Sequence, residues 1–340
     1  PRLRLAQILR ETPMNTRTTI GLMIAAVFAA VAMPALALDL TVTHFGTGMY
    51  GVPFAIAKEK GYFKEGGLDV TGFITSAGGG TTIRNAMASE IPYGEVALPA
   101  AIAAIKQGLD ITIVHGGVNS VADQVWITRK DDERIKTVQD LKGKKLGYSS
   151  PKSVTDMVTT MMLNDNGLTN QVERRSVGSI GAGITALREG GVDMIYVTEP
   201  VWSKEKDNFR PVFNSADWAP HITQTVGIVK TDYLKKNPDK IKAIIAARRK
   251  GVEFIRQHPD ETAPIFAREY KISVEQAKTA LDHVLSVKGE YWSTGGFDRE
   301  GMDAMLKGLH LVNAIEPGPF DWSKVVDESY LPPDLRTKAH

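Results

Sequence analysis

The stretch Asp39–Phe63, DLTVTHFGTGMYGVPFAIAKEKGYF, decides the fold class because a strand-like run leads through a glycine turn into a helical run. Its GTGMYG segment matches the G-x-G-x-x-G pattern of dinucleotide-binding loops. Such a loop requires a helix that begins inside the motif and an acidic residue at the end of the second strand. Pro53 favours a helix that begins after the motif, and Thr75 and Ser76 follow the second strand without an acid. The sequence therefore argues against a dinucleotide site and for another use of the same strand–turn–helix unit.

Strand-like and helical runs continue to alternate after this stretch, which predicts parallel sheets with helices on both faces. The alternation is interrupted after a strand-like run over 124–128 by the highly charged stretch 129–134. It restarts at Lys145, and a strand-like run over 222–229 returns to the first domain. We therefore expect a doubly wound α/β fold of two domains, joined by a hinge that the chain crosses twice. The expected boundaries are residues 38–127 and 224–340 for domain 1 and residues 128–223 for domain 2.

The amino-terminal segment 14–37 has the three parts of a secretory signal peptide. A charged start with Arg17 precedes the uncharged apolar run Ile20–Met33, and Ala35–Ala37 forms a small-x-small cleavage site. An uncleaved anchor helix over 20–38 is the alternative. The chain contains no cysteine, so no cysteine follows the apolar run to carry a lipid. We expect a cleavable signal peptide, no lipid anchor, and localisation in the periplasm of a Gram-negative cell.

The bulk composition argues against several classes of function. There are 41 Lys and Arg residues against 39 Asp and Glu, and a net charge of +2 is too balanced for a nucleic-acid partner. The absence of cysteine excludes disulfides, thiolate metal sites and cysteine nucleophiles. The seven histidines form neither H-x-H nor H-E-x-x-H, and G-x-S-x-G does not occur. We therefore expect a protein that is not an enzyme, with no catalytic residues, no metal site and no cofactor.

Two further loops combine small residues, hydroxyl groups and the start of a helix. They are Ser76–Thr82 and Ser149–Thr155, and each follows a strand-like run. Free backbone N–H groups and the helix dipole favour a bound anion at such a place, and the lack of Gly-Lys-Ser/Thr excludes a Walker-type nucleotide loop. Because ligands of open α/β sheets bind at the carboxyl ends of the strands, both loops should meet in a cleft. The sequence leaves open whether Arg84 or Lys152 reaches that cleft.

The segment Phe54–Val70 resembles the A-x-x-x-G-Y-F-x-x-x-G-L-x-V opening of the nitrate/sulfonate/taurine-type substrate-binding proteins, also called the NMT1/THI5-like group. Leu141–Gly147 resembles the D-L-K-G-K-x-x-G start of that family's second domain, and residues 192–193 and 199–200 resemble its V-D-A…P segment. The resemblance implies a type II periplasmic binding protein of an ABC importer. Such a protein is a monomer that closes on its ligand like a hinged clamp, and its partners are the ABC permease and its ATPase.

The resemblance also implies which residues contact the ligand. Placed by position in the family pattern, the expected contacts are Gly48, Met49, Tyr50, Ser76, Gly78, Gly79, Leu98, Pro99, Asp123, Trp126, Ser153, Thr155 and Glu199. For some of these residues a structural role is the alternative. Trp126 also suits a core, and Glu199 also suits the cap of the helix that follows it.

The expected ligand is a small organic anion, a carboxylate or a sulfonate. Helix N-termini without a committed arginine suit a monovalent oxyanion better than a phosphate, and Met49, Tyr50 and Trp126 would add an apolar wall. A thiamine-precursor pyrimidine is the alternative ligand, because Glu199 would suit a donor or a cationic group. A periplasmic ligand-sensing subunit is the alternative role, because the same fold serves both purposes.

Overall fold

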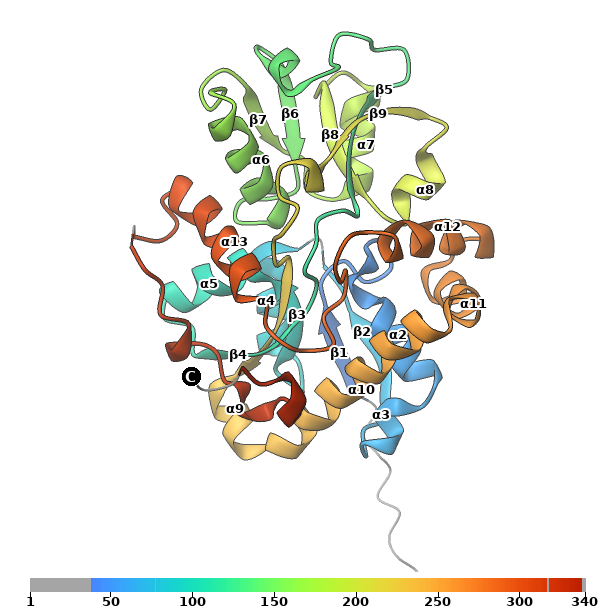
Figure 1. Cartoon of the computed structure of the whole chain (residues 1–340), viewed down its shortest axis with the longest axis vertical. Helices are drawn as coiled ribbons and strands as arrows, with labels where there is room; N and C mark the ends of the chain where they lie inside the picture. Colours follow the sequence, from blue (N-terminus) through green and yellow to red (C-terminus); the bar gives the residue numbers. More distant parts are fainter. Residues whose placement is uncertain (1–37, 77, 317, 338–340) are drawn as a thin grey trace, which may run out of the picture. The chain divides into compact units, whose positions relative to one another are not determined.

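The computed structural model describes residues 38–76, 78–316 and 318–337, so the predicted signal peptide at 14–37 lies outside the described residues. Two five-stranded sheets organise the described chain, each within an α/β domain (Figure 1). This confirms the predicted fold class. Both sheets are mixed rather than purely parallel, because each contains a strand that enters from the other domain and runs antiparallel to its neighbours.

The first sheet has the strand order β2–β1–β3–β10–β4. β1 pairs in parallel with β2 and β3, whereas β10 pairs antiparallel with β3 and β4. The carboxyl ends of β1 and β3 therefore lie at one edge of the sheet, together with the start of β10. The bounds are β1 Leu38–Val42, β2 Val70–Ile74, β3 Tyr93–Ala97, β4 Ile111–Gly116 and β10 Thr225–Lys230.

The second sheet has the strand order β7–β6–β8–β5–β9, and β5 runs antiparallel to both of its neighbours. The bounds are β5 Gln124–Arg129, β6 Lys145–Tyr148, β7 Glu173–Ser176, β8 Met194–Thr198 and β9 Phe209–Asn214. The position of β5 corrects the predicted boundary at residues 127 and 128. The chain crosses into the second domain before Gln124, because Trp126 and Ile127 already pack in the second domain's core. The charged run 129–134 forms the turn at the far end of this strand. The other boundary, at residues 223 and 224, stays a prediction.

Helices cover both faces of the first sheet, so its strands bury both of their sides. Alternate residues separate the two faces: Ile113 and Ile228 pack in one cluster, and Val114 and Val229 in the other. The helices that follow the first-domain strands are α2 Val52–Glu59, α3 Tyr62–Glu65, α4 Gly79–Ala88, α5 Leu98–Lys106 and α9 Thr231–Lys236. The remaining helices are α6 Val154–Asp165, α7 Ile180–Arg188 and α8 Val201–Glu205 of the second domain, and α10 Pro238–Gln257, α11 Pro259–Tyr270, α12 Val274–Leu285 and α13 Arg299–Leu311 towards the C-terminus.

The two domains share an apolar contact. Met157 and Met161 of α6 belong to the same buried cluster as Met302 and Met305 of α13. The helices approach so closely that a Cβ atom added to Gly308 of α13 would lie 2.8 Å from the Met157 Cβ. Among the residues that the structure describes, no helix combines the length and the hydrophobicity that crossing a bilayer needs.

Candidate functional site

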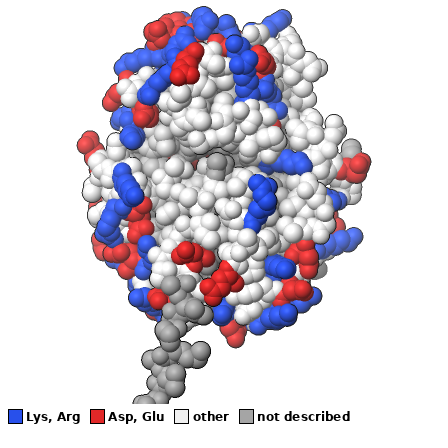
Figure 2. Space-filling view, turned by 180° about the vertical axis from the view of Figure 1, so that it is seen from behind, with Lys and Arg blue, Asp and Glu red and all other residues white. Residues whose placement is uncertain are grey.

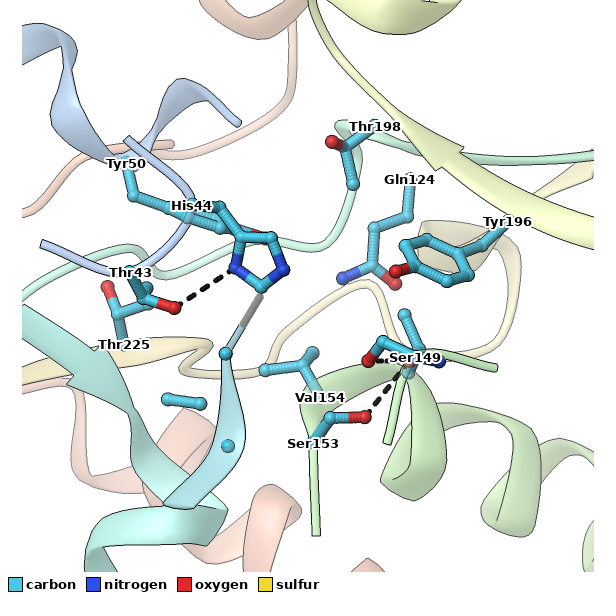
Figure 3. Close-up of a pocket in the computed structure, with 14 residues that line it drawn as sticks. Thr43, His44, Tyr50, Gln124, Ser149, Ser153, Val154, Tyr196, Thr198 and Thr225 are labelled. Atoms are coloured by element: carbon cyan, nitrogen blue, oxygen red, sulfur yellow. Dashed lines mark hydrogen bonds between the residues drawn. The ribbon is translucent and has the colours of Figure 1, made fainter. Parts of the chain in front are cut away.

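A small cavity of about 20 Å³ lies between the two domains, and both contribute to its wall (Figure 3). Part of the wall comes from residues at or just after the carboxyl ends of strands, where ligands of open α/β sheets bind. The residues that line it are Thr43, His44, Tyr50, Gly78, Gly79, Ala97, Gln124, Ser149, Ser153, Val154, Thr155, Tyr196, Thr198 and Thr225.

The first-domain wall is built around His44 and Tyr50. The two rings meet edge to face with their centroids 5.9 Å apart, and the His44 Nδ1 lies 3.0 Å from the Thr43 hydroxyl. A Cβ atom added to Gly78 would lie 2.5 Å from the His44 Cε1, and Gly78 also has a φ of +88°. Only glycine satisfies both the backbone conformation and the close approach of the ring. The glycine-rich loop therefore serves to bring backbone against His44.

The second-domain wall is a set of hydroxyl groups at the N-terminus of α6. The Thr155 hydroxyl lies 2.9 Å from the Ser149 hydroxyl and 3.0 Å from the Ser153 hydroxyl, and it accepts a hydrogen bond from the Ser149 N–H. Ser153 also caps the helix, because its oxygen accepts from the Asp156 N–H at 3.1 Å. These contacts hold the hydroxyl groups in place but leave few of their hydrogen atoms for a ligand.

Tyr196 is a buried residue of the wall whose hydroxyl group is available to donate a hydrogen bond. Its hydroxyl oxygen has no hydrogen-bond partner of good geometry within the described chain, and Figure 3 shows it directed into the space that the labelled side chains surround. Burial raises the pKa of the Tyr196 phenol, and the nearby Ser149 hydroxyl opposes this rise only in part. The phenol therefore stays protonated at neutral pH and offers an O–H to a ligand.

A network of amides at the hinge connects the cavity to both crossings of the chain. Gln224, just before β10, accepts hydrogen bonds from the Tyr50 hydroxyl at 3.0 Å and from the Gln124 Nε2 at 2.9 Å. The Gln224 Nε2 donates to the Asp123 carboxylate at 2.6 Å. Burial raises the pKa of Asp123 to about 7, while the bond from Gln224 opposes the shift. Asp123 therefore lies behind the cavity wall as part of the hinge.

Among the residues that the structure describes, the wall includes no lysine, arginine, aspartate or glutamate. The N-terminus of α6 carries its own acid, Asp156, which is buried and paired with Arg174. On the face shown in Figure 2, charged side chains of both signs gather towards the two ends, and the band between them is mostly uncharged. Selectivity in this cavity must therefore come from hydrogen-bond donors, backbone dipoles and shape. Such a site suits a neutral polar molecule or a monovalent anion better than a phosphate dianion.

The structure brings some of the residues expected from sequence to the cavity and places the others elsewhere. Tyr50, Gly78, Gly79, Ser153 and Thr155 line it. Their role as ligand contacts stays a prediction.

The large apolar residues of the expected set lie in cores instead. Met49, Leu98 and Trp126 are fully buried in three different hydrophobic clusters. Trp126 donates its indole N–H to the Ser215 hydroxyl at 2.8 Å, which satisfies its polar atom away from the cavity. Pro99 is buried in the first turn of α5. The gain from burying apolar surface accounts for these positions.

The remaining expected residues have structural partners. The Gly48 carbonyl accepts from the Tyr270 hydroxyl, and the Ser76 hydroxyl lies 2.5 Å from that of Thr82. Asp123 belongs to the hinge network described above. Glu199 accepts from the N–H and the hydroxyl of Ser203, so it caps α8, which is the structural alternative that its sequence context allowed.

Several wall residues did not belong to the expected set: Thr43, His44, Ala97, Gln124, Ser149, Val154, Tyr196, Thr198 and Thr225. The positions of some of these residues in the sequence, at the ends of strands, could have identified them. Thr43 directly follows β1, Ala97 ends β3, Ser149 directly follows β6 and Thr198 ends β8. Applying the rule of carboxyl strand ends to every parallel strand, and not only to the glycine-rich loops, finds these residues.

Comparison with known proteins agrees with this architecture. The family model described as "NMT1/THI5 like" matches residues 49–262. A putative binding protein of Bacillus subtilis, YtlA, is 24% identical over 221 residues, which are 64% of this chain. The match spans 65% of the length of YtlA, slightly less than two thirds.

Solved structures share the fold at low sequence identity. The periplasmic aliphatic sulphonate-binding protein SsuA of Escherichia coli has a TM-score of 0.68 and 17% identity, with 85% of this chain and 96% of SsuA covered. The nitrate-binding protein NrtA of Synechocystis PCC 6803 has a TM-score of 0.71 and 15% identity, with 87% of each chain covered. The desulfurization enzyme DSZB also has the fold, with a TM-score of 0.61, 14% identity, and 86% of this chain and 97% of DSZB covered. The fold alone therefore does not separate binding from catalysis.

Proposed function

Because the chain belongs to the NMT1/THI5-like family, we propose that it is a periplasmic solute-binding protein that captures a small organic anion, a carboxylate or a sulfonate, and delivers it to the permease of an ABC importer. The observation that carries the proposal is the cavity, whose wall comes from both domains. A ligand that touches both walls stabilises the closed arrangement, and a permease can recognise that arrangement. The family and the solved structures of sulphonate- and nitrate-binding proteins support this role.

Contacts across the domain interface support a clamp that closes. The Thr198 hydroxyl of the second domain donates to the Thr47 carbonyl of the first at 3.3 Å. Lys307 of α13 pairs with Asp165 of α6 at 3.1 Å. His283 of α12 lies 2.7 Å from the Glu199 carboxylate. These polar contacts are few and partly exposed, so they can break and form again as the ligand enters and leaves.

The choice of a monovalent anion rests on the donors of the wall. The Tyr196 O–H and the backbone N–H groups at the starts of α4 and α6 can surround one oxyanion without a cationic side chain. Val154 and Ala97 offer small apolar surfaces for the organic part of the ligand. An uncharged heteroaromatic ligand is the second candidate, because His44, Tyr50 and Tyr196 give the uncharged wall an aromatic character.

A thermal-shift screen tests the proposed function directly. Short carboxylates and sulfonates, nitrate, phosphate, neutral amides and aminopyrimidines are added one at a time to the purified protein. A ligand at about 100 times its Kd adds roughly 2.7 kcal/mol to the free energy of unfolding, so a true ligand raises Tm measurably. A rise confined to organic monoanions supports the proposal. A rise confined to aminopyrimidines selects the second candidate, and no rise with any solute contradicts the binding function.

Replacing Tyr196 by phenylalanine is expected to weaken binding of the ligand found in the screen by about 1.5 kcal/mol, close to a tenfold loss of affinity, because one hydrogen-bond donor is lost from a buried wall. Isothermal titration calorimetry measures the change. Tyr233→Phe on α9 is the matched control, since Tyr233 does not line the cavity and its variant should keep the original affinity. Equal affinities of both variants would remove Tyr196 from the binding site.

A further inference from the structure

A second hollow of about 670 Å³, the outer groove, lies next to the cavity and also receives residues from both domains. Its lining residues are small, apolar or basic. They are Gly80, Ile83, Arg84, Ala100, Ala103, Ala104, Gln107, Gly108 and Leu109 of the first domain, and Pro151 and Lys152 of the second.

The outer groove begins where the two domains touch above the cavity. A Cβ atom added to Gly79 would lie 3.0 Å from the Ser150 hydroxyl and 3.8 Å from the Pro151 carbonyl, so the start of α4 and the loop before α6 approach each other closely at a seam between the domains. Gly79 lines the cavity on one side of this seam, whereas Gly80 and Pro151 line the outer groove on the other. A solute that enters the cavity between these loops must pass the groove first.

The charged residues that line the outer groove, within the described part of the chain, are basic. Arg84 comes from α4 and Lys152 from the loop before α6, and no acidic residue of this part lines the groove. The Arg84 guanidinium donates to the Thr81 hydroxyl at 2.9 Å, and within the described ranges neither basic side chain forms an ion pair. The Asp156 carboxylate accepts from the Lys152 backbone N–H, but Arg174 already balances its charge. Two cationic groups, one from each domain, are therefore available to a ligand.

The rest of the outer groove is mostly apolar, and its exposure is uneven. Ile83 and Ala103 are buried beneath it and Ala104 is half-buried, whereas Leu109 is one of the few large apolar side chains that are more than a third exposed in the described chain. Exposed Leu109 and half-buried Ala104, beside two cations, complement a molecule with an anionic head and a hydrocarbon tail.

We propose that the outer groove binds organic monoanions with a hydrocarbon part, through Arg84 and Lys152 at the head and the α4–α5 surface at the tail. The inner cavity supplies donors but no cationic side chain, so the outer groove provides the charge attraction that the cavity lacks. Transfer of the bound anion from the groove into the cavity rests on the proposed function. Binding of the anion in the groove does not depend on it.

Calorimetric titration with 1-octanesulfonate tests the proposal on the full-length protein at low and at physiological ionic strength. The double variant Arg84→Gln/Lys152→Gln should bind this probe about tenfold more weakly at low ionic strength, because two exposed charge contacts are lost. The difference should shrink as salt screens the charges. Gln107→Glu, which adds a negative charge to the lining, should weaken binding as well. Neutral 1-octanol should bind equally to all of these proteins.

The matched control is the double variant Lys235→Gln/Lys236→Gln, which replaces two exposed lysines of α9. It changes the net charge by the same amount, and both lysines lie outside the groove. Unchanged affinity of this control together with weaker binding by Arg84→Gln/Lys152→Gln supports the proposal. Equal affinity of both double variants for the probe overturns it. If Tyr196→Phe weakens binding of the probe and Arg84→Gln/Lys152→Gln does not, the probe occupies the inner cavity. This result overturns the groove proposal and leaves the proposed function intact.

Discussion

Replacing Arg248 by methionine is expected to lower the free energy of unfolding by about 3–5 kcal/mol, because the change strands a buried carboxylate. The Arg248 Nε lies 2.6 Å from the Glu95 Oε2, and both side chains are almost fully excluded from solvent, with 1% and 0% of their surface exposed. Arg248 also donates to the Ser293 carbonyl at 2.6 Å and to the Gly117 carbonyl at 3.0 Å. Urea unfolding followed by circular dichroism measures the loss.

The neighbouring arginine supplies the control. Arg249 pairs with Glu253 and Asp334 on the surface, so Arg249→Met should cost less than about 1 kcal/mol. The double variant Glu95→Gln/Arg248→Met should recover part of the loss, because no buried charge is left without a partner. Similar losses for the two single arginine variants would contradict the assignment. The pair also supports the site, since the Thr225 hydroxyl in the cavity wall donates to Glu95 at 2.8 Å.

Ligand affinity is expected to fall as the pH rises above neutrality, because a proton on His283 stabilises the closed arrangement. The His283 Nδ1 lies 2.7 Å from the Glu199 Oε1, and this bond raises the pKa of His283 although partial burial opposes the rise. Opening the domains separates the two groups and returns the pKa of His283 towards its usual value. The stabilisation is therefore complete below the usual histidine pKa and is lost as the pH passes the raised value.

Other charged groups near His283 act in the same direction or are already neutralised. The Asp123 carboxylate, while it is ionised, also raises the pKa of His283. On α8, which packs against α12, Glu205 pairs with Arg188. Lys204 on the same helix is exposed to solvent. The Glu199–His283 pair therefore dominates the expected pH dependence.

Calorimetry across the neutral range, with the ligand found in the thermal-shift screen, measures this effect. His283→Gln should weaken binding at low pH by about 1.5–3 kcal/mol, the contribution of a hydrogen bond to a charged group, and should flatten the pH profile. The control His258→Gln changes an exposed histidine that lies near Glu261 within the first domain. If the wild type and His283→Gln show the same pH profile, the closing contact does not depend on this proton.

Local patterns were enough to predict most secondary structure. The strand-like run over 124–128 corresponds to β5, and the alternation restarts at Lys145, where β6 begins, because the pattern of apolar residues reports directly on buried faces. The position of β5 escaped this reasoning. The charged run 129–134 indicates a turn, but a turn can lie at either end of a strand, and only the pairing of β5 with β8 and β9 assigns that strand to the second domain.

The sequence by itself determined the two-domain α/β fold, the family, and the loops at Gly78–Gly79 and Ser153–Thr155 that meet at the cavity. Only the tertiary structure decided which other side chains face it. Met49, Leu98 and Trp126 occupy cores because burying their large apolar surfaces gains more than lining a polar cavity would. Tyr196 and Gln124 reach the wall because strands distant in the sequence end side by side across the hinge. Arg84 and Lys152 line the outer groove and not the cavity, and the close approach of Gly79 to Ser150 between the domains is a contact that no local pattern encodes.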